Sequence, residues 1–175
     1  RFTSFYSQTV CGPSRSALLT GRQPIRSKGW GMPASEITFA ELIKKSGYQT
    51  ACIGKWDVSN RKAIIDRMPN AQGFDYYFGT LGANDNGTVK FHENNEPAGK
   101  TNDMGSLIGL YTDKAIEYLE DRRDPEKPFV LYLAHTMMHT IIDASEEFRG
   151  RSQGGLYGDV VEEFDTETGR LLDAM

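Results

Sequence analysis

The sequence predicts an α/β fold built on a mostly parallel sheet. Strand-like and helix-like segments alternate along the 175 residues, which is the pattern of sheets covered by helices. The run KPFVLYLAH, residues 127–135, is almost continuously apolar and fits a strand buried on both faces of a parallel sheet. In such folds the functional site lies at the carboxyl ends of the strands.

The first predicted elements are a strand and a short helix. Residues 1–7 alternate between polar and apolar and indicate a strand. Pro13 suits the first turn of a helix, because the N–H group that proline lacks would have no partner there. We expect this helix to span residues 13–20 and to end at Gly21.

The next elements are a capped helix and a strand. Thr38 and Glu41 form the capping-box pattern, and Gly47 is expected to end the helix that follows. Residues 48–54, YQTACIG, indicate a strand.

The second half of the chain begins with a segment that we expect to leave the sheet. Residues 59–102 are rich in Asn, Asp, Gly and Pro and indicate a long excursion of the kind that often carries binding residues. Residues 111–123 indicate a helix that precedes the apolar strand at 127–135. A final helix is predicted from apolar residues at helical spacing, namely Leu156, Val160, Val161, Phe164, Leu171 and Leu172.

Composition excludes several classes of protein. The formal net charge is -4, from 20 basic and 24 acidic residues, which argues against a nucleic-acid partner. No apolar run is long enough to predict a membrane span. With only two cysteines, Cys11 and Cys52, a disulfide scaffold is not expected.

The stretch CGPSRSALLTGR, residues 11–22, is the most specific motif. A cysteine at a helix N-terminus has a lowered pKa and can be a nucleophile, although a lone cysteine is as often a structural thiol. The pattern C-x-P-S-R followed by L-T-G-R resembles the signature of the formylglycine-dependent sulfatases. The matching residues are Cys11, Pro13, Ser14, Arg15, Leu19, Thr20, Gly21 and Arg22.

This resemblance implies a specific chemistry for Cys11. In the family this cysteine is oxidised to formylglycine by a maturation enzyme, and its hydrated aldehyde offers two hydroxyl groups. One hydroxyl attacks the sulfur of a sulfate ester and the alcohol leaves; the other loses its proton and re-forms the aldehyde as sulfate departs. Arg15, about one helical turn away, is expected to stabilise the charged diol.

A second stretch, GYQTACIGKWDV, resembles the family segment G-Y-x-T-x-x-x-G-K-W-H. The resemblance implies that Lys55 contacts the sulfate, where its charge would stabilise the developing negative oxygen. Asp57 departs from the family, which has histidine there. We expect Asp57 to pair with Lys55, because residues two apart on a strand share a face. It could also bind a substrate hydroxyl, or carry a proton if its pKa were raised.

The strand PFVLYLAHTMMHT resembles the one that delivers a second histidine in the family. His139 is the better match and His135 the competitor. Histidine changes protonation near neutral pH, so His139 could bind the sulfate or protonate the leaving oxygen.

The stretch GANDNGT, residues 82–88, lies where the family places polar substrate contacts. Asn84 and Asp85 are therefore candidate substrate-binding residues. The alternative is that this stretch is a plain Asn-Gly turn without a functional role.

The resemblance implies an alkaline-phosphatase/sulfatase-like sandwich, with helices on both faces of a mostly parallel central sheet that is truncated at both ends. We expect residues 1–175 to be part of a sulfatase catalytic domain, with its first strand before Arg1 and its C-terminal part after Met175. The family binds Ca²⁺, or in some cases Mg²⁺, and only Cys11, as formylglycine, would be a ligand within this chain. Calcium needs several oxygen ligands, so we expect these 175 residues alone to be inactive.

The implied activity is hydrolysis of sulfate esters on a sulfated small molecule or polysaccharide, or on an aryl sulfate. The alternatives are a phosphonate or phosphate ester hydrolase of the same superfamily, and a catalytically silent relative that binds a sulfated polymer. Family analogy alone implies a periplasmic or secreted protein, or a lysosomal one in a eukaryote.

Overall fold

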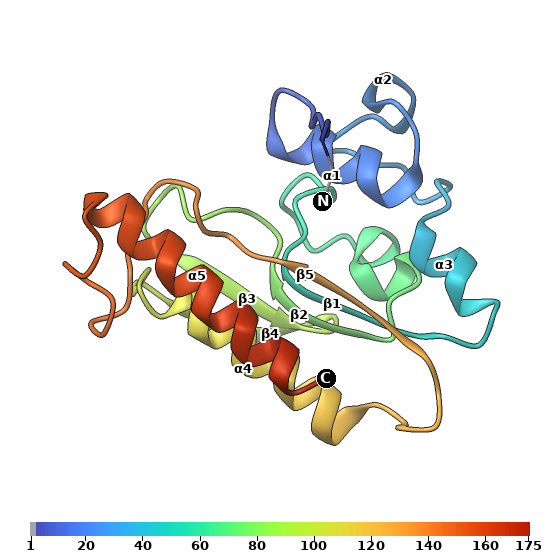
Figure 1. Ribbon diagram of the computed structural model, residues 1–175. Helices are drawn as coiled ribbons and strands as arrows, with labels where there is room; N and C mark the ends of the chain where they lie inside the picture. Colours follow the sequence, from blue (N-terminus) through green and yellow to red (C-terminus); the bar gives the residue numbers. More distant parts are fainter. Residues whose placement is uncertain (1–2) are drawn as a thin grey trace.

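A five-stranded mixed sheet forms the centre of the protein (Figure 1). The computed structural model describes residues 3–175. The strand order is β4-β3-β2-β1-β5. β1 pairs in parallel with both β2 and β5, whereas β3 and β4 are antiparallel to their neighbours. The strands are β1 (Gln49–Lys55), β2 (Tyr76–Thr80), β3 (Val89–Glu93), β4 (Glu96–Thr101) and β5 (Phe129–Ala134).

The predicted excursion of residues 59–102 is wrong, because this segment contributes three of the five strands. β2 is a buried strand next to β1, and β3 and β4 form a hairpin at the sheet edge. β4 contains Pro97 and Gly99 and is almost entirely exposed, as an edge strand permits. The polar, Gly- and Pro-containing composition of β4 hid this strand from hydropathy patterns. The antiparallel pairing of β3 and β4 makes the sheet less parallel than predicted.

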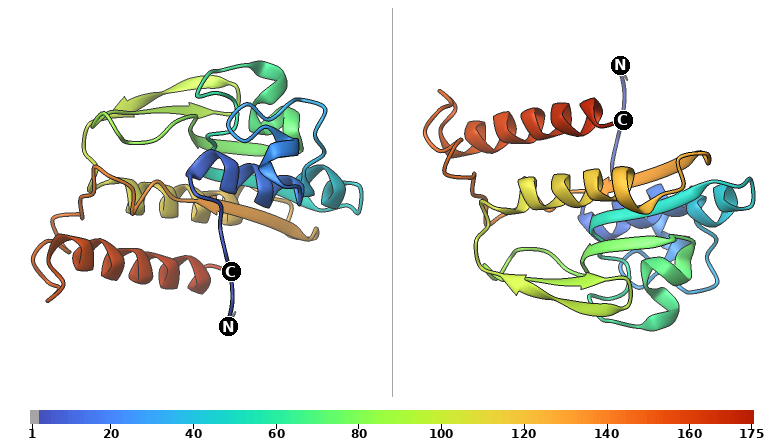
Figure 2. Two further views of the ribbon diagram at one scale, coloured as in Figure 1. Left: turned by 90° about the horizontal axis from the view of Figure 1, so that it is seen from above. Right: turned by 90° about the horizontal axis from the view of Figure 1, so that it is seen from below.

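Helices cover both faces of the sheet, as predicted (Figure 2). α4 packs against β1 and β5 on one face and is itself covered by α5, while α1 and α3 lie on the other face. The helices are α1 (Cys11–Thr20), α2 (Pro24–Ser27), α3 (Phe39–Lys44), α4 (Leu107–Glu117) and α5 (Gly155–Asp173). Shorter turns are η1 (Ile65–Arg67), η2 (Pro69–Gln72) and the π-type turn η3 (Tyr118–Arg122).

Two apolar cores result from the alternation of side chains along β1. Ala51 and Ile53 face the larger core beneath α4 and α5, and Cys52 faces the smaller core beneath α1 and α3. All three are fully buried. Burial raises the pKa of the Cys52 thiol well above its ordinary value, so Cys52 is a packing residue.

Several predicted boundaries are confirmed. α1 ends at Gly21, which has a left-handed backbone at φ 65°, although the helix begins at Cys11 rather than Pro13. Thr38 and Glu41 form both hydrogen bonds of the capping box. α4 begins four residues before the predicted Tyr111 and passes into the π-type turn η3.

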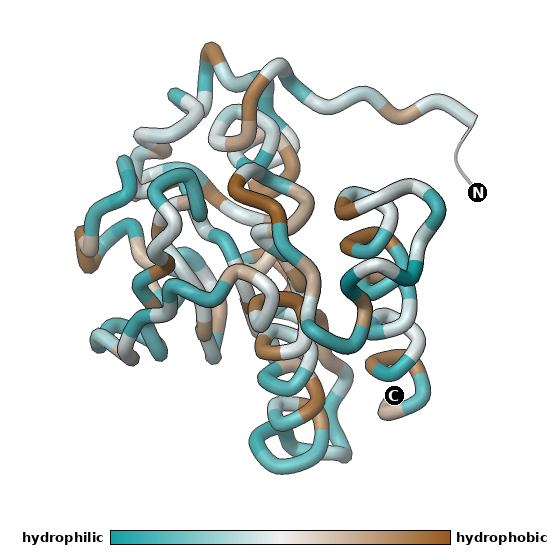
Figure 3. Tube along the Cα trace, turned by 90° about the vertical axis from the view of Figure 1, so that its left-hand side faces the viewer, coloured by the Kyte–Doolittle hydropathy of each residue, from teal (hydrophilic) through white to brown (hydrophobic). Residues whose placement is uncertain are grey.

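Two further predictions need correction. Residues 3–7 form no strand and run as an extended segment away from α1 (Figures 2 and 3); Arg1 and Phe2 lie outside the described residues. β5 is only partly buried, because it lies at one edge of the sheet in the described part of the chain.

α5 matches the periodicity that predicted it, with apolar and polar residues alternating along its length (Figure 3). Val160 and Leu171 are buried against the larger core. Leu156, Val161 and Leu172 are 42%, 38% and 61% exposed, so only one stripe of the helix is covered. Among residues 3–175, no helix is long and apolar enough to cross a membrane.

Candidate active site

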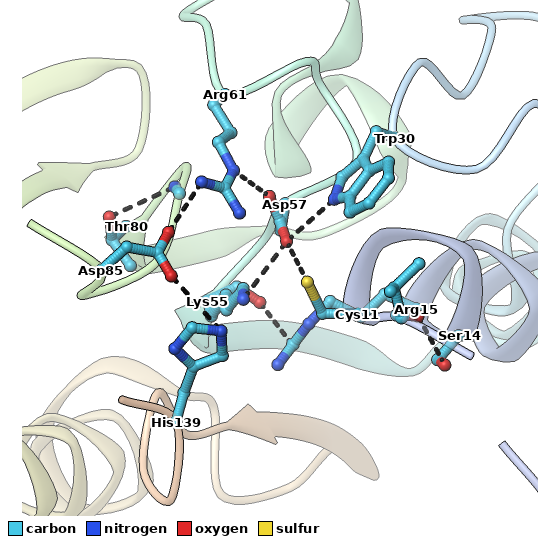
Figure 4. Close-up of polar contacts among 12 residues, drawn as sticks. Cys11, Ser14, Arg15, Trp30, Lys55, Asp57, Arg61, Thr80, Asp85 and His139 are labelled. Atoms are coloured by element: carbon cyan, nitrogen blue, oxygen red, sulfur yellow. Dashed lines mark hydrogen bonds and ion pairs between the residues drawn. The ribbon is translucent and has the colours of Figure 1, made fainter. Parts of the chain in front are cut away.

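The predicted site residues gather at the carboxyl edge of the parallel strands (Figure 4). Lys55 is the last residue of β1 and Asp57 lies in the loop that follows it. Asp85 and His139 come from the loops after β2 and β5, and Cys11 is the first residue of α1. This edge is where α/β folds place their ligands.

Cys11 is half-buried and its thiol donates a hydrogen bond to Asp57 Oδ2 at 2.9 Å. As the first residue of α1, it lies among backbone N–H groups that have no partner within the helix and that favour a negative charge. The modification predicted for this residue would therefore place its oxygens in an anion-stabilising position.

Lys55 and Arg15 bring positive charge to the same point. The Lys55 side chain is 2% exposed, and its Nζ lies 3.2 Å from Asp57 Oδ2. Arg15 Nη1 donates to the backbone oxygen of Lys55 at 2.7 Å and lies 3.4 Å from the Tyr132 hydroxyl. Arg15 thus ties α1 to the end of β1 and to the middle of β5.

Asp57 is completely buried at the centre of this cluster. It accepts hydrogen bonds from Cys11, from Trp30 Nε1 at 3.1 Å and from Arg61 Nε at 2.9 Å, and it pairs with Lys55. Burial is the largest influence and raises its pKa, but the hydrogen bond from Cys11, the Lys55 charge, Trp30 and Arg61 together hold the pKa below its ordinary value. Asp57 is therefore an ionised acceptor, and the raised pKa that a proton carrier would need is absent.

The predicted pairing of Asp57 with Lys55 is confirmed, but the predicted reason is wrong. β1 ends at Lys55, so Asp57 is not on the strand. Its backbone is left-handed at φ 56°, which few residues other than glycine adopt, aspartate being one of them. This turn, rather than strand alternation, directs the carboxylate back toward Lys55.

Arg61 is a cluster residue that sequence reasoning missed. Its Nε contacts Asp57 Oδ1 and its Nη1 contacts Asp85 Oδ2, both at 2.9 Å. The side chain is 44% exposed. It belongs to the loop after β1, outside every motif that the sequence offered, so no signal pointed to it.

His139 joins the same network through Asp85, and His135 does not. His139 Nε2 lies 3.4 Å from Asp85 Oδ1. His135 instead packs edge-on against Tyr111 and Phe164, and burial lowers its pKa to about 4. His135 lines a cavity beside Cys11 and Arg15, but of the two candidates only His139 contacts the polar network of the other predicted site residues.

Asn84 supports the His139 loop instead of facing a ligand. Its side chain is fully buried, and its Nδ2 donates to the backbone oxygens of His139 and Ile141 at 2.9 and 2.8 Å. The expected turn is also present, because Gly87 N–H donates to Asn84 O at 3.0 Å. The substrate contact expected of Asn84 therefore gives way to a positioning role, whereas Asp85 remains at the surface of the cluster.

The described residues do not make a calcium site by themselves. In residues 3–175 no group of three or more His, Cys, Asp or Glu side chains is arranged to hold a metal ion. The carboxylate that contacts Cys11 is Asp57, whose oxygens are already bound to Lys55, Arg61 and Trp30. Calcium needs six to eight oxygen ligands, so this donor set does not fit it.

Comparisons with known proteins identify the family. The Sulfatase family profile matches residues 1–175, and the chain belongs to that family. The N-acetylgalactosamine-6-sulfatase of Mus musculus is 34% identical over 209 residues, which cover 99% of this chain and 39% of that protein. An arylsulfatase of Hemicentrotus pulcherrimus is 31% identical over 206 residues, covering 100% of this chain and 37% of its own length. The chain thus spans about two fifths of these relatives.

Solved structures confirm the alkaline-phosphatase/sulfatase-like fold. The PsFucS1 sulfatase from Pseudoalteromonas sp. matches 99% of this chain and 43% of its own, with a TM-score of 0.80 and 22% identity. BT4656, solved in complex with its substrate D-glucosamine-2-N,6-O-disulfate, matches 80% of this chain and 27% of its own, with a TM-score of 0.64 and 29% identity.

Proposed function

We propose that the protein containing this chain is a sulfuric ester hydrolase that acts on a sulfated carbohydrate or an aryl sulfate, with Cys11 converted to formylglycine. One observation carries the proposal: the Cys11 thiol and the Lys55 ammonium contact the same oxygen, Asp57 Oδ2. The residue that family membership marks for modification and a buried cation thus meet at one point. The names of the relatives support sulfate esters as the substrate class.

Formylglycine would supply the nucleophile and the route for sulfate release, after a maturation enzyme has acted. The unmodified residues would provide the electrostatics. Lys55 is nearly inaccessible to water, and charge–charge interactions are stronger in such a setting. Lys55 and Arg15 would stabilise the negative charge that builds up on the sulfate oxygens.

Asp57 would orient the nucleophile. Its Oδ2 accepts a hydrogen bond from the side chain at position 11, and the same oxygen could accept one from a hydroxyl there. Its negative charge would repel sulfate, but Lys55 and Arg61 are both paired with it. Asp57 would therefore serve as a fixed acceptor rather than as a sulfate ligand.

His139 would protonate the leaving oxygen or bind the sulfate. It lies at the end of a continuous chain of contacts that runs from Cys11 through Asp57, Arg61 and Asp85 (Figure 4). Histidine changes charge near neutral pH, which suits transfer of a proton to an alcohol. Asp85 would hold its ring in place.

A divalent cation, Ca²⁺ or Mg²⁺, is part of the proposal for the whole protein. The position of Cys11, as formylglycine, would be one ligand, and the remaining oxygens would come from residues outside this chain. By family analogy we also place the protein in the periplasm, outside the cell or in a lysosome.

The test is turnover by the full-length protein, produced with a formylglycine-generating enzyme and supplied with calcium. Aryl sulfate and N-acetylgalactosamine 6-sulfate should be hydrolysed faster than the matching phosphate monoester and diester. Cys11→Ala should abolish this turnover. Faster cleavage of a phosphate ester would favour the phosphate or phosphonate hydrolase. Binding of a sulfated polymer without turnover of any ester would favour the silent relative.

A further inference from the structure

Trp30 contacts the cluster without belonging to either apolar core. It lies in the loop after α2, and Figure 4 shows the Nε1 edge of its ring turned toward Asp57. The indole is 38% exposed, and within residues 3–175 it packs with neither core. Trp56, the other tryptophan, is fully buried in the smaller core and donates to the backbone oxygen of Arg67 at 2.8 Å. Core packing therefore explains Trp56 but not Trp30.

The indole completes the set of donors around the Asp57 carboxylate. Trp30 Nε1 donates to Oδ2 at 3.1 Å. The same oxygen accepts from Cys11 and pairs with Lys55, while Oδ1 is held by Arg61. A carboxylate offers about four acceptor positions, so these four donors use all of them. Without the indole N–H, one position would be free and the carboxylate could turn away from residue 11.

Gly12 shows that the indole has a fixed position beside Cys11. Position 12 is open in the pattern C-x-P-S-R, yet here it is a buried glycine. A Cβ atom on residue 12 would overlap Cδ1 and Nε1 of the Trp30 ring. The ring therefore occupies the space that any other side chain at position 12 would need, directly next to the residue that family membership marks for modification.

The backbone ties Trp30 to the loop that carries Asp57. The Asn60 N–H donates to the Trp30 backbone oxygen at 2.8 Å. Gly31 and Ser59, the next residues along the two segments, form an antiparallel bridge. This short pairing fixes Trp30 relative to the turn at Asp57, so that the indole N–H reaches the carboxylate.

We propose that Trp30 is a positioning residue for sulfate ester hydrolysis: its N–H holds Asp57 Oδ2 against the side chain at position 11, so that the nucleophile formed there is directed at the sulfur. This inference rests on the proposed function for the reaction. In this role Trp30 acts through Asp57 and not by contact with the substrate. The aspartate that replaces the family's histidine thus depends on Trp30 and Gly12, neither of which the family motifs specify.

The first measurement is turnover of an aryl sulfate by the full-length protein, expressed per mole of formylglycine. W30F keeps an aromatic ring and removes the N–H. It should lower kcat by roughly 10- to 100-fold, the value of one hydrogen bond to a charged group, while KM changes by less than about twofold. In a D57N background, where no charge is held, the loss should be about fivefold or less.

The matched control is W56F, which removes an indole N–H whose acceptor lies outside the cluster. It should lower the free energy of unfolding and leave kcat within about twofold of the native value. A loss of kcat in W56F as large as that in W30F would show that the effect is not specific to Trp30, and would overturn the proposal.

The second measurement needs no turnover. It records the NMR signals of the indole N–H groups in the full-length protein with Cys11 unmodified, and the Trp30 signal is assigned by its absence in W30F. Asp57→Asn and Cys11→Ala should each shift this signal, because both change what surrounds the oxygen that the indole contacts. Cys52→Ala, which alters the cysteine buried in the smaller core, should leave it in place.

The two proposals fail in different ways. If W30F keeps kcat within about twofold, or costs the same with and without the Asp57 carboxylate, Trp30 is not a positioning residue although the function stands. A Trp30 signal that neither Asp57→Asn nor Cys11→Ala moves has the same meaning. If no variant hydrolyses a sulfate ester, the proposed function fails, and the NMR signal alone decides whether Trp30 holds Asp57.

Discussion

The loops that follow β1 and β5 leave the same edge of the sheet, yet they hold their polar side chains in opposite ways. Asp57, after β1, is completely buried and has four partners. His139, after β5, is 36% exposed and its ring pairs with Asp85 alone among side chains in the described structure. The first loop is fixed by its own charges, whereas the second depends on a neighbour, Asn84, for its shape. One site therefore combines a buried, fully paired carboxylate with a half-exposed imidazole at its surface.

The largest effect on folding should come from Asp57→Ala. This change leaves the buried Lys55 without its counter-ion, and breaking a buried ion pair in this way costs roughly 3–5 kcal/mol. Urea denaturation should show that loss in the free energy of unfolding. Asp57→Asn, which keeps the shape and the acceptor oxygen, should cost less. A loss below about 1 kcal/mol for Asp57→Ala would mean that the β1 loop is no more rigid than the β5 loop.

His135 should make the protein less stable as the pH falls. In the unfolded chain it takes up a proton below its ordinary pKa of 6.5, but burial holds its folded pKa at about 4. The unfolded state therefore binds more protons between these values, so stability is lost as the pH falls from 6.5 to about 4, by up to about 3 kcal/mol.

The measurement is urea denaturation across that range for the native protein and for His135→Phe, which fills the same aromatic cluster. His135→Phe should flatten the pH dependence. Asp57 affects stability in a different pH range. Because its folded pKa is lowered, its contribution to the free energy of unfolding is complete above pH 3.8, the ordinary pKa of aspartate, and is lost only as the pH falls below that value. An unchanged slope in His135→Phe would place His135 in solvent, with His139.

Asn84→Ala should have an intermediate effect. It removes two hydrogen bonds to the backbone of the β5 loop, which costs about 1–3 kcal/mol when buried acceptors lose their donor. Hydrogen exchange should accelerate in residues 136–143 and stay unchanged in residues 57–61. Asn86→Ala, two residues away and exposed, is the matched control. Equal acceleration in both loops would show that they are one unit.

The smallest effect on folding should come from His139→Ala. Since the ring is exposed and pairs only with Asp85 among the described side chains, the free energy of unfolding should change by no more than about 0.5 kcal/mol. Turnover of a sulfate ester with a poor leaving group should nevertheless fall by roughly 10²–10⁴, the usual contribution of a general acid. Activity within twofold of the native protein would remove His139 from the mechanism.

The sequence predicted what local rules control. The capping box at Thr38, the strand at β5 and the periodicity of α5 each depend on neighbouring residues, and all three are confirmed, although β5 is less buried than its apolar run predicted. The hairpin of β3 and β4 was missed, because its stability depends on pairing with β2 rather than on its own composition.

In the candidate site, too, sequence motifs predicted some features and tertiary contacts determine the others. Family motifs brought out Cys11, Arg15, Lys55 and His139, and the structure draws them to one edge of the sheet. The left-handed backbone that turns Asp57 toward Lys55, and the role of Arg61 between two carboxylates, result from tertiary contacts. No spacing in the sequence carries that information.

The most direct test of the central claim is mass spectrometry of the peptide that contains Cys11, taken from the full-length protein made with a formylglycine-generating enzyme. Conversion of the thiol to the aldehyde removes one sulfur and two hydrogens and adds one oxygen, and the product should react with a hydrazine reagent. We expect this lighter, hydrazine-reactive peptide to account for most of the protein. If a preparation hydrolyses sulfate esters while its peptide keeps the full mass of cysteine, Cys11 is not the precursor of the nucleophile.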